Sequence, residues 1–257
     1  METLIIDRAG NGVVTLALNR PAKKNAMNMA MFNELLAVFR EVSDSTSDRV
    51  LVITGAGDAF CSGADLGERG QDTRPALARL RWVADIALAL HRISKPIIAK
   101  VNGVAVGAGM NLALGCDLIV ASENARSSEI FARRGLTIDF GGAWLLPRLI
   151  GMHRAKELAL LADIISAKEA AELGLVNRVV APDQLDAFVA DWAGRLAAGP
   201  PLALSMTKRL LSNSFSLSMD EALEAEGMAQ SVNSGTEDTA EAIRAFLEKR
   251  EPKFKGR

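Results

Sequence analysis

Residues 95–111 read KPIIAKVNGVAVGAGMN, an apolar run followed by a turn rich in glycine and alanine. The apolar run from Ile97 to Val101 predicts a strand, and Gly107 predicts the start of a short buried helix that ends at Leu114. Residues 117–121 predict the next strand. Unpaired backbone N–H groups and the positive end of the dipole gather where such a helix begins. The stretch therefore predicts an α/β unit with exposed backbone donors.

A second stretch upstream has the same design. Residues 50–54 predict a buried strand, and residues 60–66, FCSGADL, form a small-residue loop that leads into a helix. Taken alone, each loop is equally typical of close packing between a helix and a strand, which also favours Gly and Ala.

Outside these two stretches, the pattern changes from mixed to helical. Residues 3–7 and 13–18 flank Gly10-Asn11-Gly12 and predict a hairpin, and residues 28–42 and 74–93 predict long helices. From about residue 183 only helices are predicted, including one over 185–196. An α/β body followed by a helical segment is the predicted organisation.

Composition narrows the possible partners and the compartment. The 257 residues carry a formal net charge of −1, which argues against nucleic acid or an anionic membrane as the main partner. Cys61 and Cys116 have no C-x-x-C spacing, and no signal peptide or membrane-spanning run is apparent, so we expect a cytoplasmic protein. His91 and His153 have no metal-ligand spacing nearby, and no metal is expected.

The order of motifs along almost the whole chain resembles the enoyl-CoA hydratase/isomerase (crotonase) family. The similar segments are LNRP (18–21) with NAM (25–27), ITG (53–55) with FCSGADL (60–66), KPIIA (95–99) with NG (102–103) and GAG (107–109), GGA (141–143) with LPR (146–148), AAELGLVN (170–177), and AFLEKREPKF (245–254).

This resemblance implies a crotonase-like spiral of ββα units over residues 1–195 and a C-terminal helical oligomerisation segment over 196–257. It implies an acyl-CoA substrate, with coenzyme A as part of the substrate and no separate cofactor, and a homotrimer or dimer of trimers. It also implies that the backbone N–H groups of Ala64 and Ala108 form an oxyanion hole. Such donors stabilise the enolate that forms when a proton leaves the carbon next to a thioester.

The resemblance further implies a set of substrate-binding positions. Lys23 is a candidate counter-ion for phosphate, although a solvated loop charge is the common alternative. Phe254 belongs to a tail that can reach a ligand, sometimes in a neighbouring subunit. The complete predicted set is Lys23, Ser62, Ala64, Asp65, Leu66, Gly107, Ala108, Phe131, Trp144 and Phe254.

The sequence departs from the family's hydratases at both of their catalytic glutamates. Asn111 stands at one of these positions, and a gapless alignment places Phe131 at the other. An amide cannot take a proton from water at neutral pH, and phenylalanine does no acid–base work. We interpret Glu129, two residues before Phe131, first as a solvated charge near Arg126, Arg133 and Arg134. Glu129 and Asn111 remain reserve catalytic candidates.

Asp139 is the main catalytic candidate. Its segment, residues 135–148, resembles that of ring-opening and double-bond isomerases of the family, where an Asp at this point moves protons. Without the family, a helix N-cap before Gly141 is the simpler interpretation. We therefore predict double-bond or ring isomerisation, or weak hydration, of an unsaturated acyl-CoA.

Two alternatives remain open. Asp139 is a nucleophile in dehalogenating members of the family, so the chain is alternatively an acyl-CoA hydrolase or dehalogenase. The missing glutamates also leave room for a non-catalytic acyl-CoA-binding scaffold. Cys61 and Ser62 have no apparent base to activate them, and we interpret them as packing residues.

Overall fold

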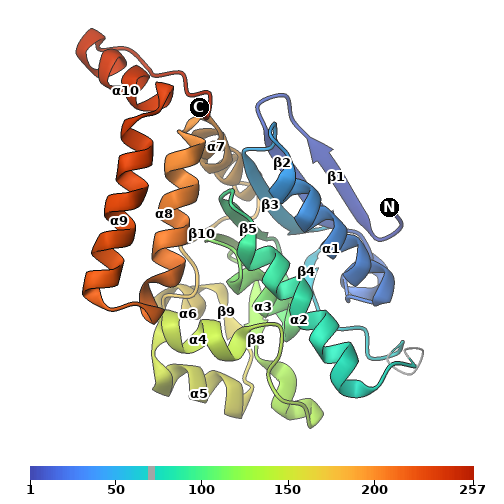
Figure 1. Ribbon diagram of the computed structural model, residues 1–257. Coiled ribbons are helices and arrows are strands. Elements are labelled where there is room, and N and C mark those ends of the chain that lie inside the picture. Colours follow the sequence, from blue (N-terminus) through green and yellow to red (C-terminus); the bar gives the residue numbers. More distant parts are fainter. Residues whose placement is uncertain (69–72) are drawn as a thin grey trace.

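The computed structural model describes residues 1–68 and 73–257, and its body is built on two sheets (Figure 1). The larger sheet has the strand order β1-β2-β3-β5-β7-β10, in which β1 is antiparallel to β2 and all other neighbours are parallel. Its strands are β1 (Leu4–Arg8), β2 (Val13–Leu18), β3 (Val50–Gly55), β5 (Ile97–Val101), β7 (Leu118–Ser122) and β10 (Arg178–Val180). The predicted hairpin and the three predicted central strands are present within one residue of their expected bounds.

The second sheet is small and has the order β4-β6-β8-β9. The parallel strands β4, β6 and β8 each follow a strand of the larger sheet after a short turn. A helical segment then follows, so the chain repeats a ββα unit, as the resemblance implied. The strands are β4 (Ala59–Cys61), β6 (Val104–Val106), β8 (Arg126–Ser128) and the antiparallel β9 (Ile165–Ser166).

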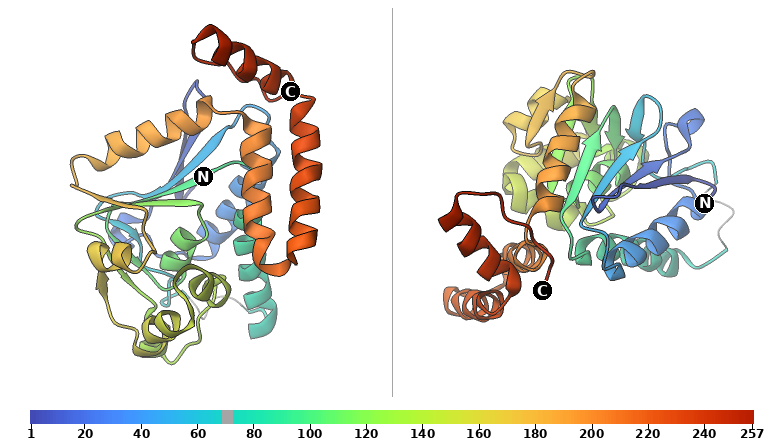
Figure 2. Two further views of the ribbon diagram at one scale, coloured as in Figure 1. Left: turned by 90° about the vertical axis from the view of Figure 1, so that its left-hand side faces the viewer. Right: turned by 90° about the horizontal axis from the view of Figure 1, so that it is seen from above.

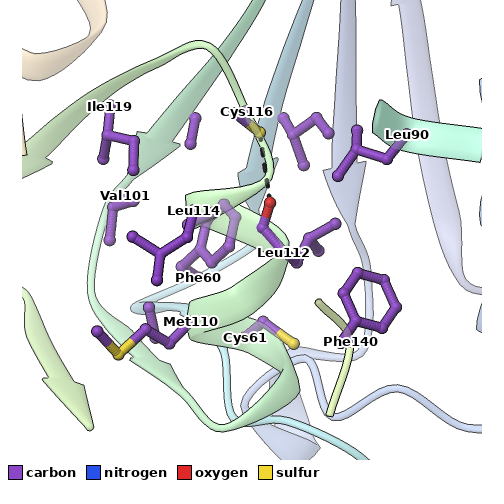
Figure 3. Close-up of a cluster of buried hydrophobic side chains, with 14 of the residues drawn as sticks. Phe60, Cys61, Leu90, Val101, Met110, Leu112, Leu114, Cys116, Ile119 and Phe140 are labelled. Carbon is purple, nitrogen blue, oxygen red and sulfur yellow. Dashed lines mark hydrogen bonds between the residues drawn. The ribbon is translucent and has the colours of Figure 1, made fainter. Parts of the chain in front are cut away.

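Helix α3 (Ala108–Leu114) lies at the centre of the body, and all of its residues are buried. Figure 3 shows apolar side chains from several elements around it, among them Phe60, Leu90, Val101 and Phe140. Gly109 allows this helix to approach β4, because a Cβ at residue 109 would lie 2.3 Å from the carbonyl oxygen of Cys61. The position of α3, and hence of its N-terminus, is therefore fixed by close packing.

The remaining helices of the body surround these sheets. The elements are η1 (Pro21–Lys23), α1 (Met29–Asp44), α2 (Ala76–Arg92), η3 (Ile130–Arg134), α4 (Gly142–Ile150), α5 (Met152–Leu161) and α6 (Ala167–Glu172). Asn28 caps α1 by accepting a hydrogen bond from the Met31 N–H, and α2 packs against α1.

Helix α7 (Leu185–Ala198) covers one face of the larger sheet. Its Val189 and Ala193 pack in one buried cluster with Val52 of β3 and Ile98 of β5. The helix is continuous through the predicted boundary at residues 195 and 196, and the body extends to its end.

The last helices project from the body, as both views in Figure 2 show. They are α8 (Pro201–Asn213), η4 (Ser214–Ser216), α9 (Met219–Ser234) and α10 (Glu237–Glu248). No residue of α8 or α9 is buried, and large apolar side chains such as Phe215 and Phe246 are exposed on this segment. Across the described residues, no helix combines the length and apolarity needed to cross a membrane.

Candidate active site

The carboxyl ends of the parallel strands β4, β6 and β8 meet at one edge of the small sheet. Ala64 comes three residues after β4, Ala108 two residues after β6, and Glu129 directly after β8. The N–H of Gly107 donates a hydrogen bond of 2.8 Å to the carbonyl oxygen of Ser128, which holds the last two of these chain segments together. Three separate segments of the sequence therefore supply one site.

The backbone N–H of Ala64 is directed away from the rest of its own loop. Met27 donates to the carbonyl oxygen of Gly63 at 2.8 Å and accepts from the N–H of Asp65 at 2.9 Å. Because Met27 uses the groups on either side of Ala64, the N–H of Ala64 points to the opposite side. In the described part of the chain, this N–H takes part in no hydrogen bond.

The N–H of Ala108 is available for a different reason. Ala108 is the first residue of α3, and the first N–H groups of a helix have no partner within it. A Cβ on Gly63 would lie 3.8 Å from the Ala108 nitrogen, so the two turns are neighbours. Two neighbouring turns of the described chain therefore each carry one unpaired backbone N–H.

A cavity of about 350 Å³ lies in front of these donors. Asp139 lines it together with Ala64 and Ala108, so the structure brings the three main candidate residues to one cavity. Most of its other walls are apolar, which suits an acyl group. The other lining residues are Met27, Asn28, Met29, Phe32, Asp65, Leu66, Glu68, Arg79, Leu80, Val83, Ala84, Leu136, Thr137, Ile138 and Phe140.

Asp139 lies in the segment between η3 and α4, and it does not cap the helix. The N-cap of α4 is Gly141, without a side-chain hydrogen bond, and Asp139 contributes its carbonyl oxygen to the turn. The Asn111 Nδ2 donates to that oxygen at 2.9 Å. The simpler interpretation of Asp139 as an N-cap is therefore wrong.

Glu129 is directed inward, and the preferred interpretation of this residue as a solvated charge is wrong. Only 1% of the residue is exposed, and Asn111 Nδ2 donates to its Oε2 at 3.3 Å. Burial raises the pKa of Glu129 to about 8, and the negative charge of Asp139 adds to this shift against the opposing hydrogen bond from Asn111. The reserve candidates Glu129 and Asn111 therefore lie beside Asp139.

Six of the ten predicted substrate-binding residues do not line this cavity: Lys23, Ser62, Gly107, Phe131, Trp144 and Phe254. Phe131 is buried, and its ring is near Gly107, where an added Cβ would lie 3.6 Å from the ring edge. Trp144 of α4 lines a neighbouring cavity of about 480 Å³. The Phe254 carbonyl oxygen accepts a hydrogen bond from Arg49, beside the start of β3. Contact of Phe254 with a ligand would need the cavity of another subunit.

The loop predicted to meet coenzyme A is fixed by backbone contacts. The Ser62 hydroxyl donates to the carbonyl oxygen of Lys23 at 3.2 Å, so both residues flank the donor at residue 64. Lys24 pairs with Asp58, whereas Lys23 forms no ion pair among the described residues. Lys23 thus has a charge available for a phosphate group.

Asp65 stabilises this loop rather than facing the ligand as a free charge. Burial alone would raise its pKa, but hydrogen bonds from Arg20 and from the Gly67 N–H outweigh burial and hold the pKa below its usual value. Arg20 Nη1 lies 2.9 Å from its Oδ2. The role of Arg20, which belongs to the LNRP motif, was not predicted from the sequence. The opposite charges of Arg20 and Asp65 were the feature that could have indicated this ion pair.

The interpretation of Cys61 as a packing residue agrees with its surroundings. The thiol is buried, and burial raises its pKa to about 12, so it stays protonated at neutral pH. A search of residues 1–68 and 73–257 finds no cluster of His, Cys, Asp and Glu that could hold a metal ion.

The neighbouring cavity, which Trp144 lines, was not predicted from the sequence. It shares Ala84 and Phe140 with the cavity that Asp139 lines, and Asn111, His91 and Trp144 contribute to its wall. Phe140 has a φ of 51°, which is uncommon for a residue other than glycine. This cavity lies between α2 and α4, where the rings of His91 and Trp144 are in contact. Because the two helices are far apart in the sequence, no local motif predicts their contact.

Comparison with known proteins identifies the family of this chain. The family model described as enoyl-CoA hydratase/isomerase matches residues 8–257. The chain is 37% identical over 262 residues to the 1,2-epoxyphenylacetyl-CoA isomerase of Escherichia coli and 38% identical over 265 residues to its 2,3-dehydroadipyl-CoA hydratase, with all of each chain covered.

A solved structure of the same family has the same fold over nearly the whole chain. The crystal structure of an enoyl-CoA hydratase from Bacillus anthracis superposes with a TM-score of 0.95 at 33% identity, covering 99% of this chain and 100% of that one. With two mixed sheets, C-terminal helices and a match over nearly its whole length, this chain belongs to the enoyl-CoA hydratase/isomerase (crotonase) family.

Proposed function

We propose that this acyl-CoA enzyme isomerises an unsaturated or ring-containing acyl-CoA, with Asp139 as the proton carrier and the N–H groups of Ala64 and Ala108 as the oxyanion hole. The observation that supports this most is the placement of a carboxyl group and two unpaired backbone donors in one cavity. Asn111 and Phe131 at the positions of the hydratase glutamates support isomerisation over hydration.

The proposed reaction is a proton shift. The Asp139 carboxylate takes a proton from a carbon conjugated with the thioester, and the electron pair moves onto the thioester oxygen. The two N–H groups stabilise that enolate oxygen, and each such donor lowers the barrier by about 3 kcal/mol. The Asp139 O–H then returns the proton to a different carbon, which restores the carbonyl group and moves the double bond.

The surroundings of Asp139 fit this role. Phe32, Val83, Ile138 and Phe140 line the same cavity and limit the access of water to the enolate. We assign Lys23 to a phosphate of coenzyme A, Ser62, Asp65, Leu66 and Gly107 to the loops that hold the thioester, and Phe254 to contact across a subunit boundary. The relative named 1,2-epoxyphenylacetyl-CoA isomerase makes a ring-containing acyl group one of the substrates to test first.

The test is a panel of enoyl-, dienoyl- and arylacetyl-CoA substrates with product analysis by mass spectrometry. Isomerisation leaves the substrate mass unchanged, whereas hydration adds one water. A product of unchanged mass with a moved double bond would support the proposal. Rapid conversion of crotonyl-CoA to the hydrated product, without isomerisation of any member of the panel, would overturn it.

Two further outcomes separate the alternatives. A covalent aspartyl adduct at residue 139, found by peptide mass mapping, would assign the nucleophilic mechanism instead. Acyl-CoA binding without turnover across the panel would assign a non-catalytic scaffold.

A further inference from the structure

Asn111 joins Glu129 to the segment that carries Asp139. Its Nδ2 donates to Glu129 Oε2 at 3.3 Å and to the backbone oxygen of Asp139 at 2.9 Å. Asn111 is itself fully buried, and Gly142 packs against its amide. A change at Glu129 is therefore transmitted through one rigid side chain to the segment that carries Asp139.

Glu129 is poorly prepared to carry a negative charge. Apart from the hydrogen bond from Asn111, its carboxyl group has no partner among the described residues, and Oε1 is buried and unsatisfied. A buried carboxylate without a cation loses far more solvation than one weak hydrogen bond restores. The Oδ1 of Asn111 is buried and accepts no hydrogen bond in the described contacts. A neutral Glu129 carboxyl group has an O–H that can donate to such an acceptor.

The charged residues on neighbouring elements do not offset this charge. On its own segment, Arg126 donates to the backbone oxygens of Glu123 and Ala125, and Arg133 pairs with Asp163. On α5, which packs against η3, the charged residues are all exposed: His153, Arg154, Lys156 and Glu157. Asp139, in the segment before α4, carries a negative charge that opposes ionisation of Glu129.

We propose that Glu129 is a positioning residue that keeps its proton during turnover, so that Asp139 works as the single carboxylate of the pair, and that ionisation of Glu129 switches the site off. This inference rests on the proposed role of Asp139. A charge on Glu129 would oppose both the ionised form of Asp139 and the enolate oxygen in front of it.

The switch falls in the alkaline range. Burial and the charge of Asp139 raise the pKa of Glu129 to about 8, so the proton is present at neutral pH and is lost above it. The pKa of Cys61 is about 12, and burial lowers the pKa of His91, so neither side chain titrates there. The alkaline limb of the pH profile therefore reports on Glu129.

The experiment compares wild type with Glu129→Gln, which resembles the neutral acid in size and shape. Glu123→Gln, an exposed position six residues upstream, is the matched control. In wild type and in the control, kcat should fall about tenfold per pH unit above about pH 8. In Glu129→Gln, kcat at pH 7 should stay within about threefold of wild type, and the alkaline limb should disappear.

Two results would overturn the inference. One is an alkaline limb that persists in Glu129→Gln. The other is a folded Glu129→Gln protein that is inactive at pH 7, which would mean that Glu129 itself must ionise. If Asp139→Asn were fully active, the proposed function would fail first, so the two failures are distinguishable.

A measurement on the wild-type protein keeps the test independent of the variant's folding. With ¹³C-labelled glutamate side chains, one carboxyl resonance should titrate near pH 8. A spectrum in which no glutamate carboxyl titrates well above its ordinary pKa of 4.5 would contradict the inference.

Discussion

A Cβ on Gly142 would lie 2.4 Å from the Asn111 Nδ2, so the bare backbone at the start of α4 presses directly on the buried amide. This contact fixes the side chain that joins Glu129 to the Asp139 segment. Gly142 thus has a steric role in the site.

Replacement of Gly142 by Ala should destabilise the protein and reduce turnover together. The new methyl group must displace the Asn111 amide, at about 1–3 kcal/mol in the free energy of unfolding, and kcat should fall because the hydrogen bonds of that amide are disturbed. Urea unfolding and steady-state kinetics measure the two effects. Gly227→Ala in α9 is the control, since no atom lies within 4 Å of its added Cβ. A Gly142→Ala protein as stable and active as wild type would show that the contact has no function.

Asp139→Asn should reduce kcat by about 10²- to 10⁴-fold, the usual contribution of general acid–base catalysis. Binding of acyl-CoA, measured by calorimetry, should change little, because the amide keeps the shape of the carboxyl group. Asp183→Asn, at an exposed position before α7, serves as the control. Full turnover by Asp139→Asn would remove Asp139 from the mechanism.

The stability of Glu129→Gln relative to wild type should depend on pH. The pKa of Glu129 is about 8 in the folded protein, against 4.5 for the unperturbed group, so the folded state retains the proton that the unfolded state loses. Wild-type stability should therefore decline relative to the variant as pH rises from about 4.5 to about 8, by an amount on the order of a few kcal/mol. Parallel urea midpoints for both proteins across this range would contradict a buried neutral acid.

Five strands of the larger sheet were predicted from the sequence, whereas its sixth strand, β10, and the small sheet were not. The central strands at residues 50–55 and 97–101 are continuous apolar runs, as strands covered on both faces must be. Strands β4, β6 and β8 have only three residues each, too few for a pattern to emerge. Their ends carry the site, so its geometry needed the structure.

Some of the candidate residues of the site were likewise predicted from the sequence, and others were not. Ala64, Ala108 and Asp139 were predicted from short motifs that resemble those of the family. Glu129 was expected only as a reserve, because its inward direction depends on η3 beginning immediately after β8. Phe32 and Phe140 were missed because their contact joins residues more than a hundred positions apart.

The exposed apolar side chains of the C-terminal helices predict self-association. Phe215, Phe246 and Leu247 are 67%, 82% and 74% exposed, which is unfavourable for an isolated chain. Light scattering coupled to size exclusion should give three or six times the 27.4 kDa of one chain. A monomer at micromolar concentration would contradict the expected trimer or dimer of trimers.

The most direct test of the oxyanion hole removes one N–H with little change to the fold. Ala108 is the first residue of α3, where proline is tolerated, so Ala108→Pro deletes the donor at a compatible helical position. Met219→Pro, at the first residue of α9, is the control for such a change. With circular dichroism unchanged, kcat of Ala108→Pro should drop by about 10²- to 10³-fold. A folded Ala108→Pro protein with wild-type kcat would contradict the central claim that the backbone at residues 64 and 108 stabilises a thioester enolate.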